Sequence, residues 1–144
     1  MDETKNLGKT IGTAVTGGTV LALTGDLGSG KTSFVQGLAI GLEVPAGYYI
    51  ASPSYTLINE YPGRFTLFHV DLYRISDPME LEDIGLYEIL RNSGIVAIEW
   101  ADRMEQEPLS DSINIHFELT DDKTRKINIT TYDLKNADLL KSIL

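Results

Sequence analysis

The hydrophobic pattern of the first third of the chain predicts a helix, a buried strand and a second helix. Residues 4–13 have apolar side chains at helical spacing, and residues 19–24 form a short apolar run typical of a buried strand. Apolar side chains then recur along one helix face at Phe34, Val35, Leu38, Ala39 and Leu42. Gly41 and Pro45 mark the expected end of this second helix.

Two β-hairpins are predicted where strand-like segments surround turn signals. Strands at 55–61 and 65–71 enclose a Pro-Gly-Arg turn, and strands at 112–119 and 125–132 enclose a polar turn at 120–123. Each hairpin would contribute an antiparallel pair of strands to a sheet.

A further helix, a buried strand and a C-terminal helix complete the predicted elements. A helix should begin at Asp77 and extend towards Leu90, because the aspartate cap is followed by proline at the first helical position and glutamate at the third. Gly85 is a candidate for an interruption of that helix. The apolar run 95–98 is typical of a strand covered on both faces, and residues 136–144 suit a terminal helix.

The segment between the first strand and the second helix has the phosphate-loop pattern G-x-x-x-x-G-K-[S/T]. Its glycines let backbone N–H groups approach phosphate oxygens at a helix N-terminus, where the helix dipole favours negative charge. Lys31 is expected to reach the β- and γ-phosphates, and the Thr32 hydroxyl to bind Mg²⁺. The predicted nucleotide-binding residues in this segment are Gly25, Asp26, Leu27, Gly28, Ser29, Gly30, Lys31, Thr32 and Ser33.

These elements predict a three-layer α/β P-loop fold with a central mixed sheet flanked by helices. The sheet should be mixed because hairpins accompany the strand-loop-helix unit. The chain has 144 residues, which suits one domain, and no linker-like stretch divides residues 1–144. The order of the strands does not follow from the pattern.

Charge and cysteine content narrow the classes of function. The chain has no cysteine, which excludes disulfides, thiolate metal sites and cysteine nucleophiles. The formal net charge of -9 disfavours strong unaided binding to nucleic acid, so any RNA should be held by another protein. The N-terminus lacks a signal-peptide pattern, and no apolar run approaches the roughly 18 residues of a membrane span. We therefore expect a cytoplasmic protein without membrane contact.

Two acidic residues end predicted apolar strands and are candidates for metal chemistry. Magnesium on a triphosphate usually needs a carboxylate opposite the loop, and Asp71 and Glu99 have suitable positions. We predict Lys31, Asp71 and Glu99 as catalytic residues. The predicted metal ligands are Thr32, Asp71 and Glu99. Taken alone, either acid could instead cap a turn or pair with an arginine, and the pattern does not divide metal binding and water activation between them.

ATP is the expected nucleotide, with Mg²⁺ as its metal. Guanine-selective enzymes of this class often carry an Asn-Lys-x-Asp element, which this chain lacks. Small-molecule kinases commonly add an arginine-rich lid, but here the arginines are scattered at Arg64, Arg74, Arg91, Arg103 and Arg125. Arg74 is close to Asp71 in sequence and suits either a phosphate contact or a surface ion pair. Without an obvious built-in arginine finger, hydrolysis by the chain alone should be slow.

Four motifs together resemble the bacterial TsaE ATPases, which support threonylcarbamoyladenosine formation on transfer RNA. They are the phosphate loop, Ser-Pro-Ser-Tyr-Thr-Leu at 52–57, His-Val-Asp-Leu-Tyr-Arg at 69–74 and Ile-Glu-Trp at 98–100. Their order and spacing agree from about Leu21 to Trp100, which is over half of the chain. The set is far more specific than the phosphate loop, which alone indicates only a superfamily.

The resemblance implies an ATP-hydrolysing subunit that works with TsaD-type and TsaB-type partners, which would hold the tRNA. It also implies an acidic pair near the metal, Asp71 and Glu99, and a switch-like loop from Ser52 to Thr56. The family commonly has threonine where this chain has Ser54. If that hydroxyl senses the γ-phosphate or the metal, Ser54 retains it with looser positioning, because serine lacks β-branching.

Several residues keep more than one interpretation at this point. Trp100 suits stacking near the nucleotide, docking of a partner, or a half-buried strand end. His69 and His116 are expected to be structural, because no second histidine or cysteine stands at ligand spacing. Two other functions remain open: a small-molecule kinase, and a nucleotide-binding regulatory module that does not hydrolyse.

Overall fold

The computed structural model describes residues 2–53, 55–104, 111–121 and 124–144. The described strands are β1 (Val20–Gly25), β2 (Ile58–Tyr61), β3 (Leu67–Asp71), β4 (Ile95–Glu99), β5 (Ile113–Leu119) and β6 (Arg125–Thr131). The described helices are α1 (Asp2–Ala14), α2 (Lys31–Gly41), α3 (Glu80–Asp83), α4 (Leu86–Leu90), the 3₁₀ turn η1 (Ala101–Met104) and α5 (Leu134–Ile143).

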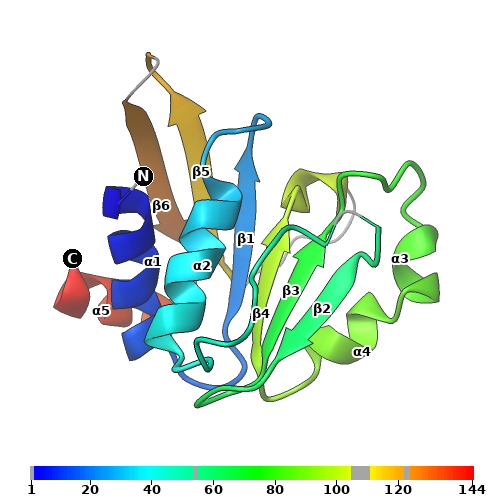
Figure 1. The fold of residues 1–144 in the computed structure, drawn as a ribbon, viewed down its shortest axis with the longest axis horizontal. Coiled ribbons are helices and arrows are strands. Elements are labelled where there is room, and N and C mark those ends of the chain that lie inside the picture. The colour runs from blue at the N-terminus through cyan, green and yellow to red at the C-terminus, as the bar shows by residue number, and fades with distance from the viewer. Residues whose placement is uncertain (1, 54, 105–110, 122–123) are drawn as a thin grey trace.

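The described strands form one mixed sheet in the order β2-β3-β4-β1-β5-β6 (Figure 1). The central strands β3, β4, β1 and β5 run parallel to one another. The edge strands β2 and β6 pair antiparallel with β3 and β5, respectively. The mixed sheet and both predicted hairpins are therefore confirmed.

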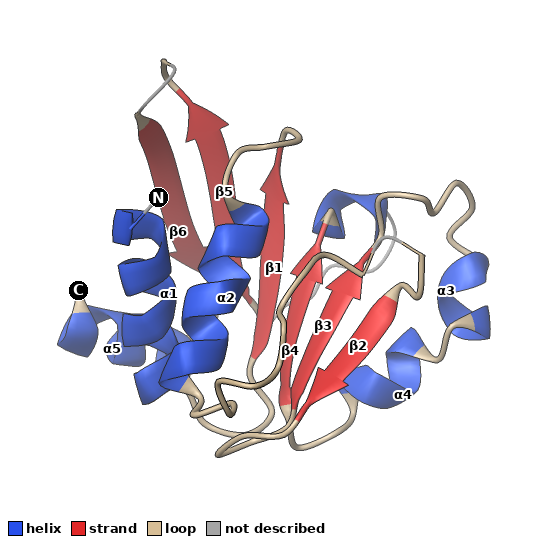
Figure 2. Cartoon of the chain, viewed as in Figure 1, coloured by secondary structure: helices blue, strands red, loops and turns tan. Residues whose placement is uncertain are grey.

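Helices cover both faces of the sheet, as Figure 2 shows. Along β1 the side chains alternate between the faces: Leu21 and Leu23 pack with α1, α2 and α5, whereas Val20 packs with α3 and α4. The neighbouring strand β4 alternates in the same way and is buried along its whole length. This double burial explains its continuous apolar sequence and confirms the predicted three-layer arrangement.

Close contact between α1 and α2 holds the helix that follows the glycine loop. A Cβ atom added to Gly37 of α2 would lie 1.9 Å from the Lys5 carbonyl oxygen of α1. A Cβ atom on Gly8 of α1 would lie 2.2 Å from the Phe34 carbonyl oxygen of α2. Both distances are far inside van der Waals contact, so glycine is required where the two backbones approach each other.

Three boundaries differ from the sequence prediction. The helix predicted to begin at Asp77 begins at Glu80, while its predicted interruption at Gly85, which has a left-handed φ of 79°, is confirmed and divides it into α3 and α4. The first hairpin strand begins at Ile58 and not at residue 55, since Leu57 also has a positive φ, of 69°. The terminal helix begins earlier than predicted, at Leu134, because the Asp133 side chain caps it.

Among the described residues, no helix is both long enough and apolar enough to span a membrane.

Candidate nucleotide-binding site

The glycine loop joins the end of β1 to the start of α2, which confirms the predicted strand-loop-helix order. Gly25, Gly28 and Gly30 have φ values of 138°, 78° and 113°, which L side chains rarely adopt. Gly30 caps α2 without a side chain, so the first N–H groups of the helix stay available to an anion. The loop therefore has the local features of a phosphate-binding turn.

Lys31 is folded back onto the loop and is only 4% exposed. Its ammonium group donates to the carbonyl oxygen of Gly25 at 2.5 Å and to that of Asp26 at 2.9 Å. Burial lowers the pKa of Lys31, and this effect exceeds the opposing influence of nearby carboxylates, Glu99 foremost. Since a polyphosphate in this loop would bring negative charge close to the ammonium, it would favour the protonated form.

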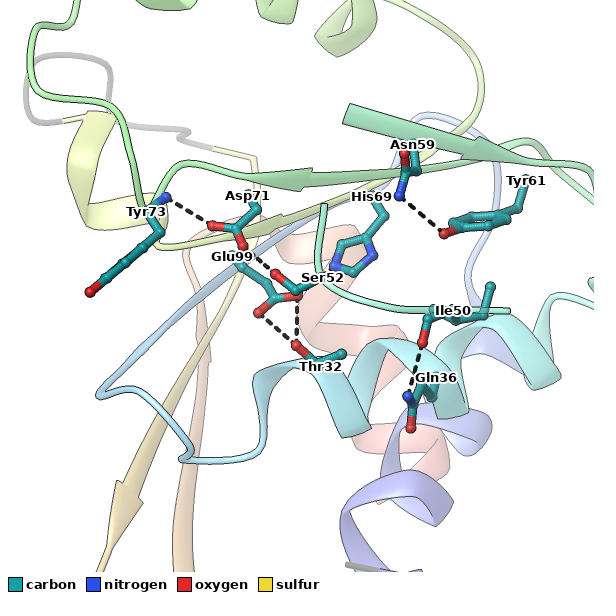
Figure 3. Close-up of polar contacts among 10 residues, drawn as sticks. All are labelled: Thr32, Gln36, Ile50, Ser52, Asn59, Tyr61, His69, Asp71, Tyr73 and Glu99. Carbon is teal, nitrogen blue, oxygen red and sulfur yellow. Dashed lines mark hydrogen bonds and ion pairs between the residues drawn. The ribbon is translucent and has the colours of Figure 1, made fainter. Parts of the chain in front are cut away.

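Asp71 and Glu99 lie side by side at the ends of β3 and β4, where they are register partners. They are 2% and 3% exposed, respectively. The Thr32 hydroxyl lies 3.1 Å from each carboxylate oxygen of Glu99 and donates to this group (Figure 3). The structure thus brings the predicted metal ligands, Thr32, Asp71 and Glu99, to one edge of the sheet.

His69 also belongs to this constellation, although its sequence context indicated only a structural role. It is completely buried, and its Nε2 lies 2.5 Å from Oε2 of Glu99. Because an ionised carboxylate only accepts, Nε2 carries the proton and donates. Strand periodicity could have indicated this contact, since His69 is two residues before Asp71 and thus on the same face of β3. The other histidine, His116, bonds instead to the Thr24 hydroxyl, at 2.8 Å.

The segment that enters the predicted switch-like loop is attached to Asp71. The Ser52 hydroxyl donates a short hydrogen bond to Oδ2 of Asp71, and the Tyr73 amide donates to Oδ1 at 2.8 Å (Figure 3). Gln36 of α2 donates to the Ile50 carbonyl oxygen at 2.9 Å and holds the same segment from the other side. Ser54, predicted to contact nucleotide, lies outside the described residues.

A pocket of about 320 Å³ opens between the glycine loop and the acidic pair. Its lining residues are Leu27, Gly28, Gly30, Lys31, Thr32, Ser33, Ser52, Asp71, Tyr73, Glu99, Trp100 and Arg125. The predicted binding residues Gly25, Asp26 and Ser29 do not line it. Gly25 and Asp26 instead direct their carbonyl groups towards Lys31, so the two residues shape the loop from behind.

Two aromatic residues cover one side of this pocket. Trp100 is half-buried and has a positive φ of 59°, a strained conformation for a bulky side chain. The centroid of its ring lies 4.2 Å from the Lys31 ammonium nitrogen and 4.9 Å from the centroid of the Tyr73 ring. This position favours the interpretation of Trp100 as a residue near the nucleotide.

The structure changes the interpretation of two arginines, Arg125 and Arg74. Arg125 lines the pocket, although nothing in its local sequence marks it and the hairpin strand that carries it is distant along the chain. Arg74 does not line the pocket; its guanidinium lies 5.1 Å from the Tyr55 ring centroid. Among the described residues Arg74 forms no ion pair either.

The donor set at this edge of the sheet suits a hard cation. It consists of one hydroxyl and two carboxylates, which are oxygen ligands of the kind that Mg²⁺ prefers. No cluster of three or more acidic, histidine or cysteine side chains that could hold a metal alone is found in the described ranges. Mg²⁺ itself usually takes one or two carboxylates and completes its coordination with water and substrate phosphates.

Fold and site together define a P-loop protein of the nucleotide-binding class. Comparison with known proteins narrows the class further. The model of the threonylcarbamoyl adenosine biosynthesis protein TsaE family matches residues 1–127. The chain therefore belongs to the TsaE family, as its four motifs predicted.

Individual relatives agree over most of their length. The tRNA threonylcarbamoyladenosine biosynthesis protein TsaE of Nostoc sp. is 43% identical, with 96% of this chain and 86% of the relative covered. The protein of the same name from Treponema pallidum is 36% identical, with coverages of 88% and 93%. The crystal structure of YdiB from Bacillus subtilis matches with a TM-score of 0.83 and 31% identity, covering 99% of this chain and 87% of that one.

Proposed function

We propose that the chain binds ATP with Mg²⁺ in this pocket and hydrolyses it as its part in tRNA threonylcarbamoyladenosine biosynthesis. The main support for this proposal is that one pocket, at the end of β1, is lined by Lys31, Thr32, Asp71 and Glu99. The role in tRNA modification rests on membership of the TsaE family.

In the proposed reaction, water attacks the γ-phosphorus of ATP and the bond to the β–γ bridging oxygen breaks. ADP and inorganic phosphate leave, and the proton of the water passes to solvent or phosphate. Lys31 and the loop amides would hold the β- and γ-phosphates and stabilise charge that develops on their oxygens. Asp71 or Glu99 would orient the attacking water, since both are buried acceptors at the pocket edge.

Magnesium, when bound, would neutralise part of the phosphate charge. Thr32 would be one of its ligands, with the acidic pair beside it. The Thr32 hydroxyl now donates to Glu99, so these two side chains are already close enough to serve one small cation. His69 would act through Glu99 by fixing the orientation of its carboxylate.

We further propose that TsaD-type and TsaB-type proteins are the partners and that they hold the tRNA. The net charge of -9 supports this division, because an acidic chain gains little from phosphate contacts of its own. Nucleotide state would reach the partners through the loop after Ser52, since this residue bonds directly to Asp71.

A reconstitution with the two partner proteins and tRNA tests the proposal. Multiple-turnover modification and phosphate release would be compared between the unchanged chain, Lys31→Ala and the control Lys126→Ala, which removes an exposed charge from β6. We expect Lys31→Ala to reduce phosphate release by about 100-fold or more and to stop repeated modification. Equal modification with Lys31→Ala would refute the proposal.

Two outcomes would indicate the other functions. Transfer of the γ-phosphoryl group to a metabolite in cell extract, without free phosphate, would identify a small-molecule kinase. Recovery of intact ATP after a single-turnover incubation with the partners would identify a regulatory module that binds nucleotide without hydrolysing it.

A further inference from the structure

We propose that Arg125 is a second cationic ligand of the nucleotide and that its guanidinium group binds the phosphate chain from the β6 side of the loop. The inference rests on the proposed function, because it assumes that a nucleotide occupies the pocket. It adds a residue that no motif of the sequence indicates.

Arg125 begins β6, at the far edge of the sheet from the hairpin that carries Asp71. Its side chain crosses to the glycine loop. A Cβ atom added to Gly30 would lie 3.1 Å from Nε and 3.3 Å from Cδ of Arg125. The arginine therefore covers the point where the loop becomes α2, beside Lys31, Thr32 and Ser33 in the pocket wall.

The Nε group of Arg125 is a donor without an acceptor in the described part of the chain. The atom is shielded from solvent and has no hydrogen-bond partner there. Buried donors are normally satisfied, and one that remains unpaired beside a pocket suits a ligand acceptor. Lys31 differs in this respect, because loop carbonyl groups satisfy its ammonium group.

The charge of Arg125 also has no ion-pair partner among the residues that the structure describes. Among the described residues, neither the ion pair of Arg64 with Glu43 nor the contact of His69 with Glu99 involves Arg125. The acidic pair of the pocket comes from β3 and β4, on one side of β1, while β6 lies on the other side. Arg125 lines the same pocket but lies on the other side of β1 from those acids, so a bound anion would neutralise its charge.

Phosphate fits this donor better than the other parts of a nucleotide do. The Arg125 stem lies on Gly30, whose following N–H groups form the positive end of α2. A guanidinium group can give two parallel hydrogen bonds to phosphate oxygens. Bound phosphate would thus contact the helix end, Lys31 and Arg125 at the same time.

Binding measurements with two probes test the assignment. Dissociation constants would be measured for magnesium-ATP and for magnesium with inorganic tripolyphosphate, which has no base or sugar. The variants are Arg125→Gln, Arg125→Lys and the control Lys126→Gln, whose side chain is exposed on the same strand. Thermal unfolding of each variant, followed by circular dichroism, reports whether the fold is intact.

We expect Arg125→Gln to weaken both probes by about 10- to 100-fold, the range for loss of a charge-assisted hydrogen bond. The loss of affinity in Arg125→Lys should be intermediate, because lysine keeps the charge but lacks the planar guanidinium group that gives two parallel hydrogen bonds. Lys126→Gln should change neither probe by more than about twofold, since an exposed charge is screened.

Three results would overturn the inference. Unchanged binding of both probes in folded Arg125→Gln and Arg125→Lys would exclude a nucleotide contact, while the proposed function would stand. Weaker ATP binding with unchanged tripolyphosphate binding would assign Arg125 to the base or the sugar. Failure of the unchanged chain to bind either probe would refute the proposed function itself.

Discussion

The contact between His69 and Glu99 yields a quantitative prediction, because both side chains are buried and few other groups can replace the donor. Glu99 is 3% exposed and accepts from Thr32 and from His69. His69→Leu would put an apolar side chain of moderate size in the core and remove the shorter of the two hydrogen bonds to Oε2 of Glu99, leaving the Thr32 hydroxyl as its donor. Loss of a hydrogen bond to a charged group destabilises a protein by about 1.5–3 kcal/mol.

That loss is large in relation to the free energy of unfolding of an ordinary domain, which is about 5–15 kcal/mol. At roughly 2–4 °C per kcal/mol for a chain of this size, we expect the Tm of His69→Leu to fall by about 3–12 °C. His69→Gln should restore much of the stability, because its amide nitrogen can donate from nearly the position of Nε2.

Urea unfolding at pH 7 would measure these differences, followed by the fluorescence of Trp100 and by circular dichroism so that two-state behaviour is checked. The matched background is Glu99→Gln, which has no charge to leave unpaired. In that background His69→Leu should cost at most about half as much free energy of unfolding, giving a coupling energy of about 0.7 kcal/mol or more. An equal loss in both backgrounds would show that His69 only fills space, and would refute its role in positioning Glu99.

Three further predictions concern the loop and its support. Gly37→Ala should lower the free energy of unfolding by about 1–3 kcal/mol or more, because the new Cβ would lie 1.9 Å from the Lys5 carbonyl oxygen. The control Gly47→Ala has open space around the new Cβ and should change the free energy of unfolding by under about 0.5 kcal/mol. Equal effects of the two substitutions in urea unfolding would contradict this prediction. Trp100 fluorescence should change on addition of magnesium-ATP, since Lys31 lies 4.2 Å from its ring and must move towards phosphate. An equal fluorescence change in Lys31→Ala would show that movement of Lys31 does not cause it. Removal of metal with EDTA should abolish phosphate release and weaken ATP binding, and full release without metal would exclude Mg²⁺ as the expected cofactor.

The parts of the site that could be predicted from sequence are those encoded by a few neighbouring residues. The phosphate loop requires glycines at set positions, so its pattern is visible in the chain, and Asp71 and Glu99 end apolar runs that read as strands. Their proximity follows because parallel strands bring their carboxyl ends to one edge. Local sequence was sufficient for this half of the pocket.

The other contributions depend on strand order, which local sequence does not encode. Arg125 reaches Gly30 only because β5 and β6 continue the sheet beyond β1. The contact of Ser52 with Asp71 likewise joins residues from different elements across the pocket. The break at Gly85 was accessible, since glycine within a helical pattern is a local signal, whereas the start of β2 moved because Leu57 adopts an unusual positive φ.

The strand order also separates two effects that a nucleotide can have on this protein. A triphosphate at the end of β1 would have Asp71 on one side, where Ser52 is attached, and Arg125 on the other side. In the described residues Arg125 has no hydrogen bond to the Ser52 segment.

We therefore expect Arg125→Gln to weaken ATP binding but, at saturating ATP, to leave association with the partner proteins nucleotide-dependent. Ser52→Ala should do the reverse: bind ATP within about threefold of the unchanged chain and lose that dependence. Pull-down of the TsaD-type and TsaB-type proteins with ATP and with ADP measures both, and loss of nucleotide dependence in Arg125→Gln at saturation would show that the two sides of the pocket are not independent.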